Sequence, residues 1–299
     1  MQEDRRRRRK WRTNWPALLL CALVLAALVW GVTTVVRKLS SYGSRSIRTS
    51  QADAQEPQAD AQPEEPADPY ADVAKNSYDP NGFYKEDGFL HYADGTLMSE
   101  VGVDISSHQQ TVDWAAVKEA GVDFAILRAG YRGYTEGAIQ EDETFRTNLQ
   151  AAKEAGLKVG VYFFSQALDR AEAVEEAEFV LNLLDGETLD YPIFFDWEDI
   201  EAEARTDGMD SATLTACALA FCKRVELNGY RGGVYFNQRF GYEEFDLSQL
   251  QDYALWLAEY NLTPSFSYHF EVWQYANDGM LSGVEGPVDL NLTFVEKTA

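Results

Sequence analysis

From residue 101 onward, short apolar runs alternate with longer stretches whose apolar residues recur every three or four positions. The short runs predict buried strands, and the longer stretches predict helices with one apolar face. The first five predicted strands are residues 101–105, 124–129, 159–164, 193–195 and 233–236. Helices are predicted between them at 113–120, 143–155, 170–184 and 210–228, and three of these end at a glycine.

The last third of the chain departs from this alternation. After a short helical piece at 242–253, three more strand-like runs follow at 254–258, 270–275 and 288–294. Their connections are too short and too rich in Gly, Pro and Asn for a crossover helix, so some late strands should pair antiparallel. We therefore predict an α/β fold over residues 100–299, a modified TIM-like barrel of eight strands and five helices.

The N-terminal region predicts a membrane anchor. Residues 13–36 form 24 consecutive positions without a charge, long enough to cross a bilayer as a helix. The apolar run exceeds that of a usual signal peptide and lacks a small-residue cleavage site, and Leu20 is bulky where a lipoprotein signal at Cys21 requires a small residue. Seven Lys/Arg precede the run and four follow it, so the basic tail 1–12 should remain cytoplasmic and the rest extracellular.

Two segments separate this anchor from the barrel. Residues 37–69 contain a small tandem repeat rich in Gln, Ala, Asp and Pro, and their composition predicts a disordered acidic tether. Residues 70–99 regain aromatic side chains and carry the turn signals Asn81–Gly82 and Asp94–Gly95. This lead-in is predicted to form a hairpin-like segment that packs on the barrel.

Composition limits the classes of partner. The net charge of the 299 residues is −23, although residues 1–48 hold eleven Lys/Arg against two acids. A strongly acidic globular part argues against nucleic acid, whose binding needs Lys/Arg to neutralise phosphates. Cys217 and Cys222 lie five apart in a helical pattern and point to different sides, so they are expected as core thiols. We expect a monomer.

Candidate chemistry centres on Asp196 and Glu198, which follow the apolar run 191–195. Side chains two apart in an extended segment share a face, so both acids should point the same way. Two carboxylates beside an apolar wall cannot both ionise easily, and one is held protonated near neutral pH. Such a pair can supply a general acid, although an isolated D-x-E sequence more often only begins a loop.

Other predicted strands also end in candidate site residues, and in a barrel these ends meet at one mouth. Asp104, near the end of the first predicted strand, and Asp289, in the last one, would bring the number of converging acids to four. Aromatic and basic side chains at the strand ends suit sugar rings, which have apolar faces and polar rims. The predicted substrate contacts are Arg128, Tyr162, Tyr235, Trp256 and Trp273.

Seven sequence motifs in this order resemble the glycoside hydrolase family 25 lysozymes. They are VGVDISSH (101–108), FAILRAGY (124–131), VGVYFFS (159–165), FDWE (195–198), WLAEY (256–260), WQY (273–275) and VDLN (288–291). The resemblance covers the globular part from about residue 101 to 294 and excludes the anchor, the tether and the lead-in. It implies a modified barrel of eight strands and five helices.

The resemblance also implies N-acetylmuramidase activity on the β-1,4 glycan of bacterial peptidoglycan, with no cofactor. By motif, Glu198 corresponds to the proton donor, Asp196 to its partner, and Asp104 and Asp289 to flanking acids. Either Asp196 attacks the sugar, or the substrate's 2-acetamido group does so with help from Asp196. The similarity of D-x-E to other hexosaminidases favours substrate assistance.

The sequence leaves open two alternative functions, which belong to classes other than glycoside hydrolase. The domain could be a non-catalytic module that binds cell-wall glycan, a reading that the complete set of acids opposes. The acids at the barrel mouth could instead bind Mg²⁺ or Ca²⁺, which prefer oxygen ligands. Zinc is poorly supported, because the three histidines, His91, His108 and His269, show no ligand spacing.

Overall fold

The structure, a computed structural model, describes residues 70–297. The predictions of a basic tail, a membrane anchor and an acidic tether all fall on residues 1–69 and lie outside the described residues. In the described range, each helix is too short or too polar to cross a bilayer.

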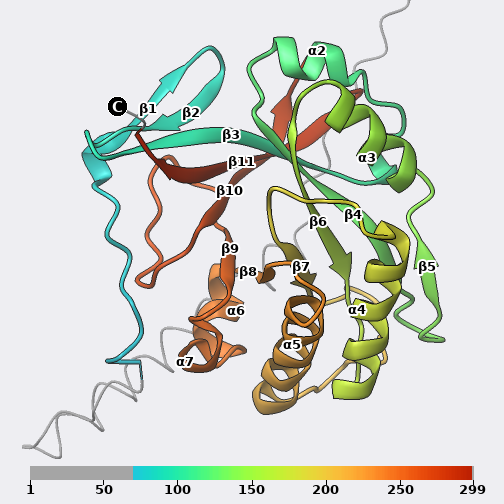
Figure 1. The fold of residues 1–299 in the computed structure, drawn as a ribbon. Helices are drawn as coiled ribbons and strands as arrows, with labels where there is room; N and C mark the ends of the chain where they lie inside the picture. The colour runs from blue at the N-terminus through green and yellow to red at the C-terminus, as the bar shows by residue number, and fades with distance from the viewer. Residues whose placement is uncertain (1–69, 298–299) are drawn as a thin grey trace, which may run out of the picture. The chain divides into compact units, whose positions relative to one another are not determined.

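Eight strands close into a barrel (Figure 1), as the sequence predicts. In barrel order they are β3 (Leu97–Ile105), β4 (Phe124–Arg132), β6 (Lys158–Phe164), β7 (Ile193–Asp196), β8 (Gly232–Asn237), β9 (Ala254–Ala258), β10 (Val272–Met280) and β11 (Pro287–Glu296). Strands β3 to β10 run parallel to their neighbours, whereas β11 is antiparallel to both β10 and β3. The short strand β5 (Ile139–Glu141) pairs antiparallel with β4 outside the barrel.

The number of helices differs from the predicted five, because the described chain contains six α-helices. They are α2 (Trp114–Glu119), α3 (Phe145–Glu154), α4 (Arg170–Leu184), α5 (Ser211–Glu226), α6 (Gln238–Glu243) and α7 (Leu247–Leu250). The single helical piece expected at 242–253 is divided into α6 and α7. Asn237 accepts the Phe240 N–H and Asp246 accepts the Ser248 N–H, so each short helix has its own N-cap.

Strand β7 shows how the barrel buries apolar side chains on both faces. Phe194 points into the barrel, where its ring centroid lies 5.1 Å from that of Trp256. The neighbouring Phe195 points outward and packs on Phe221 of α5, at a centroid distance of 5.6 Å. A parallel strand covered by helices is buried on both faces, which explains why 193–195 is uniformly apolar. Cys217 and Cys222 are buried free thiols in α5.

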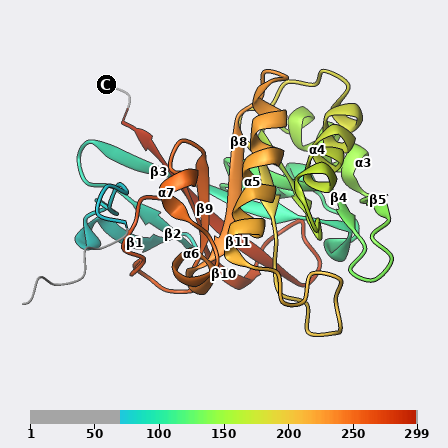
Figure 2. The ribbon, with the colours of Figure 1, turned by 90° about the horizontal axis from the view of Figure 1, so that it is seen from below.

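The lead-in forms a hairpin of β1 (Phe83–Glu86) and β2 (Phe89–Tyr92) beside β3 and away from α4 and α5 (Figure 2). Its turn is Asp87–Gly88, with φ of 47° and 90°, a pair of positive values typical of two-residue hairpin turns. The sequence analysis did not identify this turn. Asn81–Gly82 instead belongs to the 3-10 helix η1 (Pro80–Gly82), and Asp94–Gly95 connects β2 to β3.

Candidate active site

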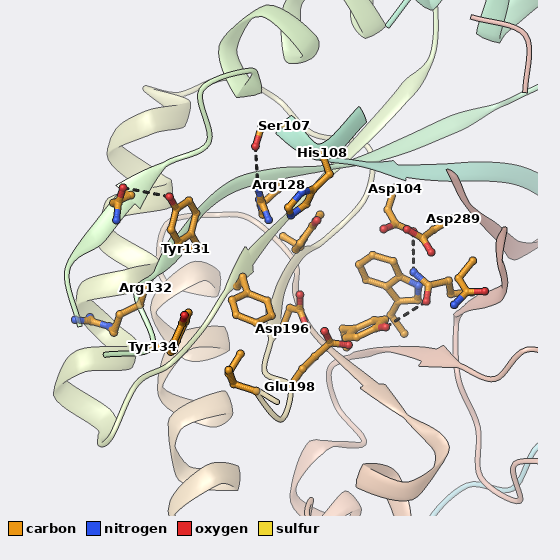
Figure 3. Close-up of a pocket in the computed structure, with 18 of the residues that line it drawn as sticks. Asp104, Ser107, His108, Arg128, Tyr131, Arg132, Tyr134, Asp196, Glu198 and Asp289 are labelled. Atoms are coloured by element: carbon orange, nitrogen blue, oxygen red, sulfur yellow. Dashed lines mark hydrogen bonds between the residues drawn. The ribbon is translucent and has the colours of Figure 1, made fainter. Parts of the chain in front are cut away.

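A cleft with a volume of about 890 Å³ opens at the carboxyl ends of the parallel strands. It is lined by all four predicted acids, Asp104, Asp196, Glu198 and Asp289, and by the predicted contacts Arg128, Tyr162, Tyr235 and Trp256. Figure 3 shows Asp104 and Asp289 next to each other, while Asp196 and Glu198 come from the end of β7. The barrel therefore brings together residues that lie up to 185 positions apart in the chain.

Asp196 is the last residue of β7 and is buried between two neighbouring strands. In the sheet register it is opposite Phe164 of β6 and Tyr235 of β8. Its Oδ1 atom is buried and accepts no hydrogen bond from any residue in the range 70–297. A buried carboxylate oxygen without a donor is costly, so this atom is suited to receive a donor from a bound molecule.

The environment raises the pKa of both acids of the D-x-E sequence. Burial raises the pKa of Asp196 well above its ordinary value, the charges of Glu198 and Asp104 add to the rise, and Arg128 opposes it. Burial also raises the pKa of the half-buried Glu198, as does the charge of Asp289, whereas the Tyr235 hydroxyl opposes the rise. Both carboxyl groups therefore hold protons at a higher pH than they would in water.

Asp104 and Asp289 face each other across the antiparallel pair β3–β11. The Oδ2 atom of Asp104 accepts hydrogen bonds from Gln274 Nε2 at 2.9 Å and from Asn291 Nδ2 at 2.8 Å. Burial raises the pKa of Asp104 to about 6, although these two donors favour its charged form. Burial and the charge of Asp104 raise the pKa of Asp289 to about 8.

Arg128 supplies a fixed positive charge to the cleft. Its Nε donates to Asp142 Oδ2 at 2.8 Å, and a terminal nitrogen donates to Ser107 Oγ at 3.0 Å. Its guanidinium also lies over the ring of Tyr131, 5.3 Å from the centroid. These contacts hold the guanidinium in place, and its charge favours the ionised form of Asp196.

The side of the cleft formed by β8, β9 and β10 combines aromatic rings with a buried amide. Gln274 Oε1 accepts hydrogen bonds from the hydroxyls of Tyr235 at 3.2 Å and Tyr260 at 3.0 Å. The indole of Trp256 donates to Asn291 Oδ1 at 2.9 Å and meets Tyr235 edge-on at 4.7 Å between centroids. Each polar atom of this wall is thereby satisfied while ring surface faces the cleft.

Trp273 does not belong to the cleft, and its prediction as a substrate contact is wrong. Its side chain has 0% exposure, its Nε1 donates to the Glu259 carbonyl at 2.8 Å, and its ring packs edge-on against Phe83 of the hairpin. Successive side chains of a strand point to opposite faces. On β10 the inward residues are Val272 and Gln274, so Trp273 points outward.

Several cleft residues were not predicted as site residues, including Gln274, Tyr260 and His108. Gln274 carried a usable signal, because a single polar residue in the apolar run 272–275 marks the side of the strand that faces a polar site. His108 lies in η2 (Ser107–Gln109), after the end of β3. In the described residues, no group of three or more His, Cys, Asp or Glu side chains is arranged to hold a metal ion.

Comparison with known proteins identifies related sequences. A family model described as glycosyl hydrolases family 25 matches residues 103–284. An autolytic lysozyme of Clostridium acetobutylicum is 32% identical over 191 residues, which cover 64% of this chain and 54% of that protein. Lysozyme M1 of Streptomyces globisporus is 26% identical over 201 residues, covering 64% of this chain and 66% of that protein.

Solved structures share the fold. The modular autolysin LytC from Streptococcus pneumoniae aligns with a TM-score of 0.58 and 24% identity, over 71% of this chain and 52% of LytC. A family 25 glycosyl hydrolase from Bacillus anthracis aligns with a TM-score of 0.55 and 22% identity, over 68% of this chain and 91% of that chain. The chain thus spans about half the length of the C. acetobutylicum lysozyme and of LytC.

Proposed function

The chain belongs to glycosyl hydrolase family 25, and from this membership we propose that its barrel is a peptidoglycan hydrolase. The bond cleaved is the β-1,4 linkage from N-acetylmuramic acid to N-acetylglucosamine. The observation that carries the proposal is the pair Asp196 and Glu198, two neighbouring carboxyl groups with raised pKa values in one cleft. Glycoside cleavage needs a protonated acid at the leaving oxygen and a second group near the anomeric carbon.

Glu198 is the proton donor in this proposal. It lies beyond the end of β7 and is half-buried, so its carboxyl group is protected from full solvation and still lines the cleft. Its raised pKa keeps the transferable proton in place above the pH at which an ordinary glutamate ionises. The neighbouring charge of Asp289 reinforces this effect.

Asp196 assists attack by the substrate's own 2-acetamido group. The unsatisfied Oδ1 of Asp196 supports this role, because an acetamido N–H is the type of donor that this atom lacks. A carboxylate that accepts this N–H orients the acetamido oxygen toward the anomeric carbon and balances the positive charge of the cyclised intermediate. The charge of Arg128 favours the ionised form of Asp196 that this role needs.

The remaining residues bind the sugars. Asp104 and Asp289 bind hydroxyl groups or the hydrolytic water, and Tyr162, Tyr235 and Trp256 offer ring edges and faces to the glycan. Arg128 is fixed by Asp142 and can donate to a sugar oxygen without a large loss of side-chain entropy.

Mass spectrometry of the fragments that residues 70–299 release from purified cell walls tests the proposal. We expect fragments with N-acetylmuramic acid at the reducing end. Fragments that end in N-acetylglucosamine would assign a different bond, and binding to several wall types without any cleavage would favour a glycan-binding module. Either result would overturn the proposed activity.

We also propose, from the sequence of residues 1–69, that a single membrane span holds the barrel outside the cell as a monomer. Protease added to intact cells should then cut within residues 51–66 and release the barrel. A tether that is protected from external protease but cleaved after lysis would reverse the proposed orientation.

A further inference from the structure

A second groove adjoins the cleft, with a volume of about 560 Å³. We call it the hairpin groove, and it is lined by Lys85, Gly88, Leu90, Tyr260, Asn261, Leu262, Tyr275, Ala276, Asn277, Asp278, Gly279 and Leu290. Tyr260 and Asn277 also line the cleft, so the two spaces adjoin at these residues. A molecule bound in the cleft can therefore extend a branch into the hairpin groove.

The β1–β2 hairpin forms one wall of this groove and lies before residues 103–284, the part matched by the family model. The hairpin is firmly attached to the barrel. The Leu90 N–H donates to the Tyr275 hydroxyl at 3.2 Å, the Tyr92 N–H donates to Ser99 Oγ at 2.8 Å, and Phe83 packs on Trp273. The outward-facing Trp273 thus supports this wall.

The lining of the hairpin groove combines apolar surface with a few charged and amide groups. Leu90, Tyr275 and Leu290 are buried and provide an apolar floor. Asn261 and Asn277 supply amide donors and acceptors at the edge. Lys85 is exposed, and no residue in the range 70–297 forms an ion pair with it.

The charges of the lining indicate which ligand chemistry fits. In a chain with a net charge of −23, an unpaired lysine in a groove offers a local site for a carboxylate. Asp278 lines the same groove and can pair with an ammonium group. A short peptide with small apolar side chains, free carboxylates and an amino group complements this surface.

We propose that the hairpin groove binds the peptide stem of peptidoglycan while the glycan strand occupies the cleft. This inference rests on the proposed function. The stem branches from the muramic acid through its lactyl group, and because the two spaces adjoin at Tyr260 and Asn277, one substrate can occupy both. Lys85 pairs with a stem carboxylate, and the floor of Leu90 and Tyr275 receives the apolar side chains.

The test compares two substrates, uncrosslinked glycan with its peptide stems and the same glycan after an amidase has removed them. The measured quantity is the ratio of kcat/KM for the two. We expect wild type to prefer the stem-bearing glycan, and Lys85→Glu to lower the ratio about 3- to 10-fold, as expected when an exposed charge pair becomes repulsive. Added salt should lower the wild-type ratio and raise that of Lys85→Glu, because it screens the attraction in one and the repulsion in the other.

Lys223→Glu is the matched control, because it makes the same change of charge on α5 outside the residues that line either space. It should keep the wild-type ratio. Wild-type cleavage of both substrates without preference, or an equal fall of the ratio in both variants, would overturn the stem site and leave the proposed function intact. Failure of wild type to cleave either substrate would overturn both proposals.

Discussion

Replacement of Glu198 by glutamine tests the proposed chemistry most directly. Glutamine has nearly the same size and can still bond with the Tyr235 hydroxyl, so the packing of the cleft should not change. What is lost is the transferable proton. We expect kcat to fall by about 10² to 10⁴, which corresponds to about 2.7–5.4 kcal/mol of transition-state stabilisation.

The structure also fixes the direction of the pH dependence. Burial and the charge of Asp289 raise the pKa of Glu198 above its ordinary value. Because the protonated form is the active one, wild-type kcat/KM should fall as the pH rises through this raised pKa. Glu198→Gln should lack this alkaline limb. Asp289→Asn should move the limb to lower pH, since it removes a charge that raises the pKa of Glu198.

The assay is initial-rate release of soluble fragments across the pH range, with binding of intact glycan measured separately. Glu203→Gln provides the matched control, because Glu203 is an exposed residue of the loop that follows Glu198 and does not line the cleft. It should retain wild-type turnover, and Glu198→Gln should retain binding. Near-normal turnover by Glu198→Gln would refute the assignment of the proton donor.

Three further predictions follow from the structure. The free energy of unfolding, measured in urea, should fall as the pH rises from about 5 to 8. Burial raises the pKa of Asp289 to about 8, so the folded state binds more protons than the unfolded state in this range. Asp289→Asn should flatten this dependence. Arg132→Met should destabilise the fold by about 3–5 kcal/mol, because Arg132 Nε pairs with the fully buried Glu176 at 2.7 Å and its loss leaves that carboxylate unpaired. Adding Glu176→Gln removes the unpaired charge and should restore part of the loss. Trp273→Leu should lower the melting temperature without raising KM for stem-free glycan, because the indole is buried outside the cleft.

The barrel strands were predictable because each is a short apolar run that ends at a polar residue or a turn. The bounds of β9 (Ala254–Ala258) and α4 (Arg170–Leu184) agree with the predicted ones. The carboxylates of β3 and β7 were predictable for a related reason, since parallel strands place their carboxyl ends at one mouth. Asp289 lies at the amino end of β11 and reaches the same mouth because this strand runs antiparallel to β3, which places Asp289 opposite Asp104.

The errors arise where strand direction or local hydrogen bonding decides the structure. The motif WQY at 273–275 does not indicate which of its alternating residues face the inside of the barrel. The aromatic Trp273 was therefore predicted as a substrate contact in place of Gln274. The helical piece at 242–253 gave no sign of its break, which the side chain of Asp246 stabilises by capping α7. The hairpin turn at Asp87–Gly88 was missed although it is an Asp-Gly pair like Asp94–Gly95, because two other turn signals flank the hairpin and the choice among the three needs the strand pairing.

The distribution of hydrogen-bond donors in the cleft determines how its protons are shared. Asp104 accepts two amide N–H groups, which favour its charged form, although burial raises its pKa to about 6. Its negative charge raises the pKa of Asp196, whose Oδ1 has no donor among the described residues. In the proposed mechanism an acetamido N–H of the substrate supplies that donor and favours the ionised form of Asp196. Binding of the substrate thus brings Asp196 into its working state, while Glu198 keeps the proton that the leaving oxygen receives.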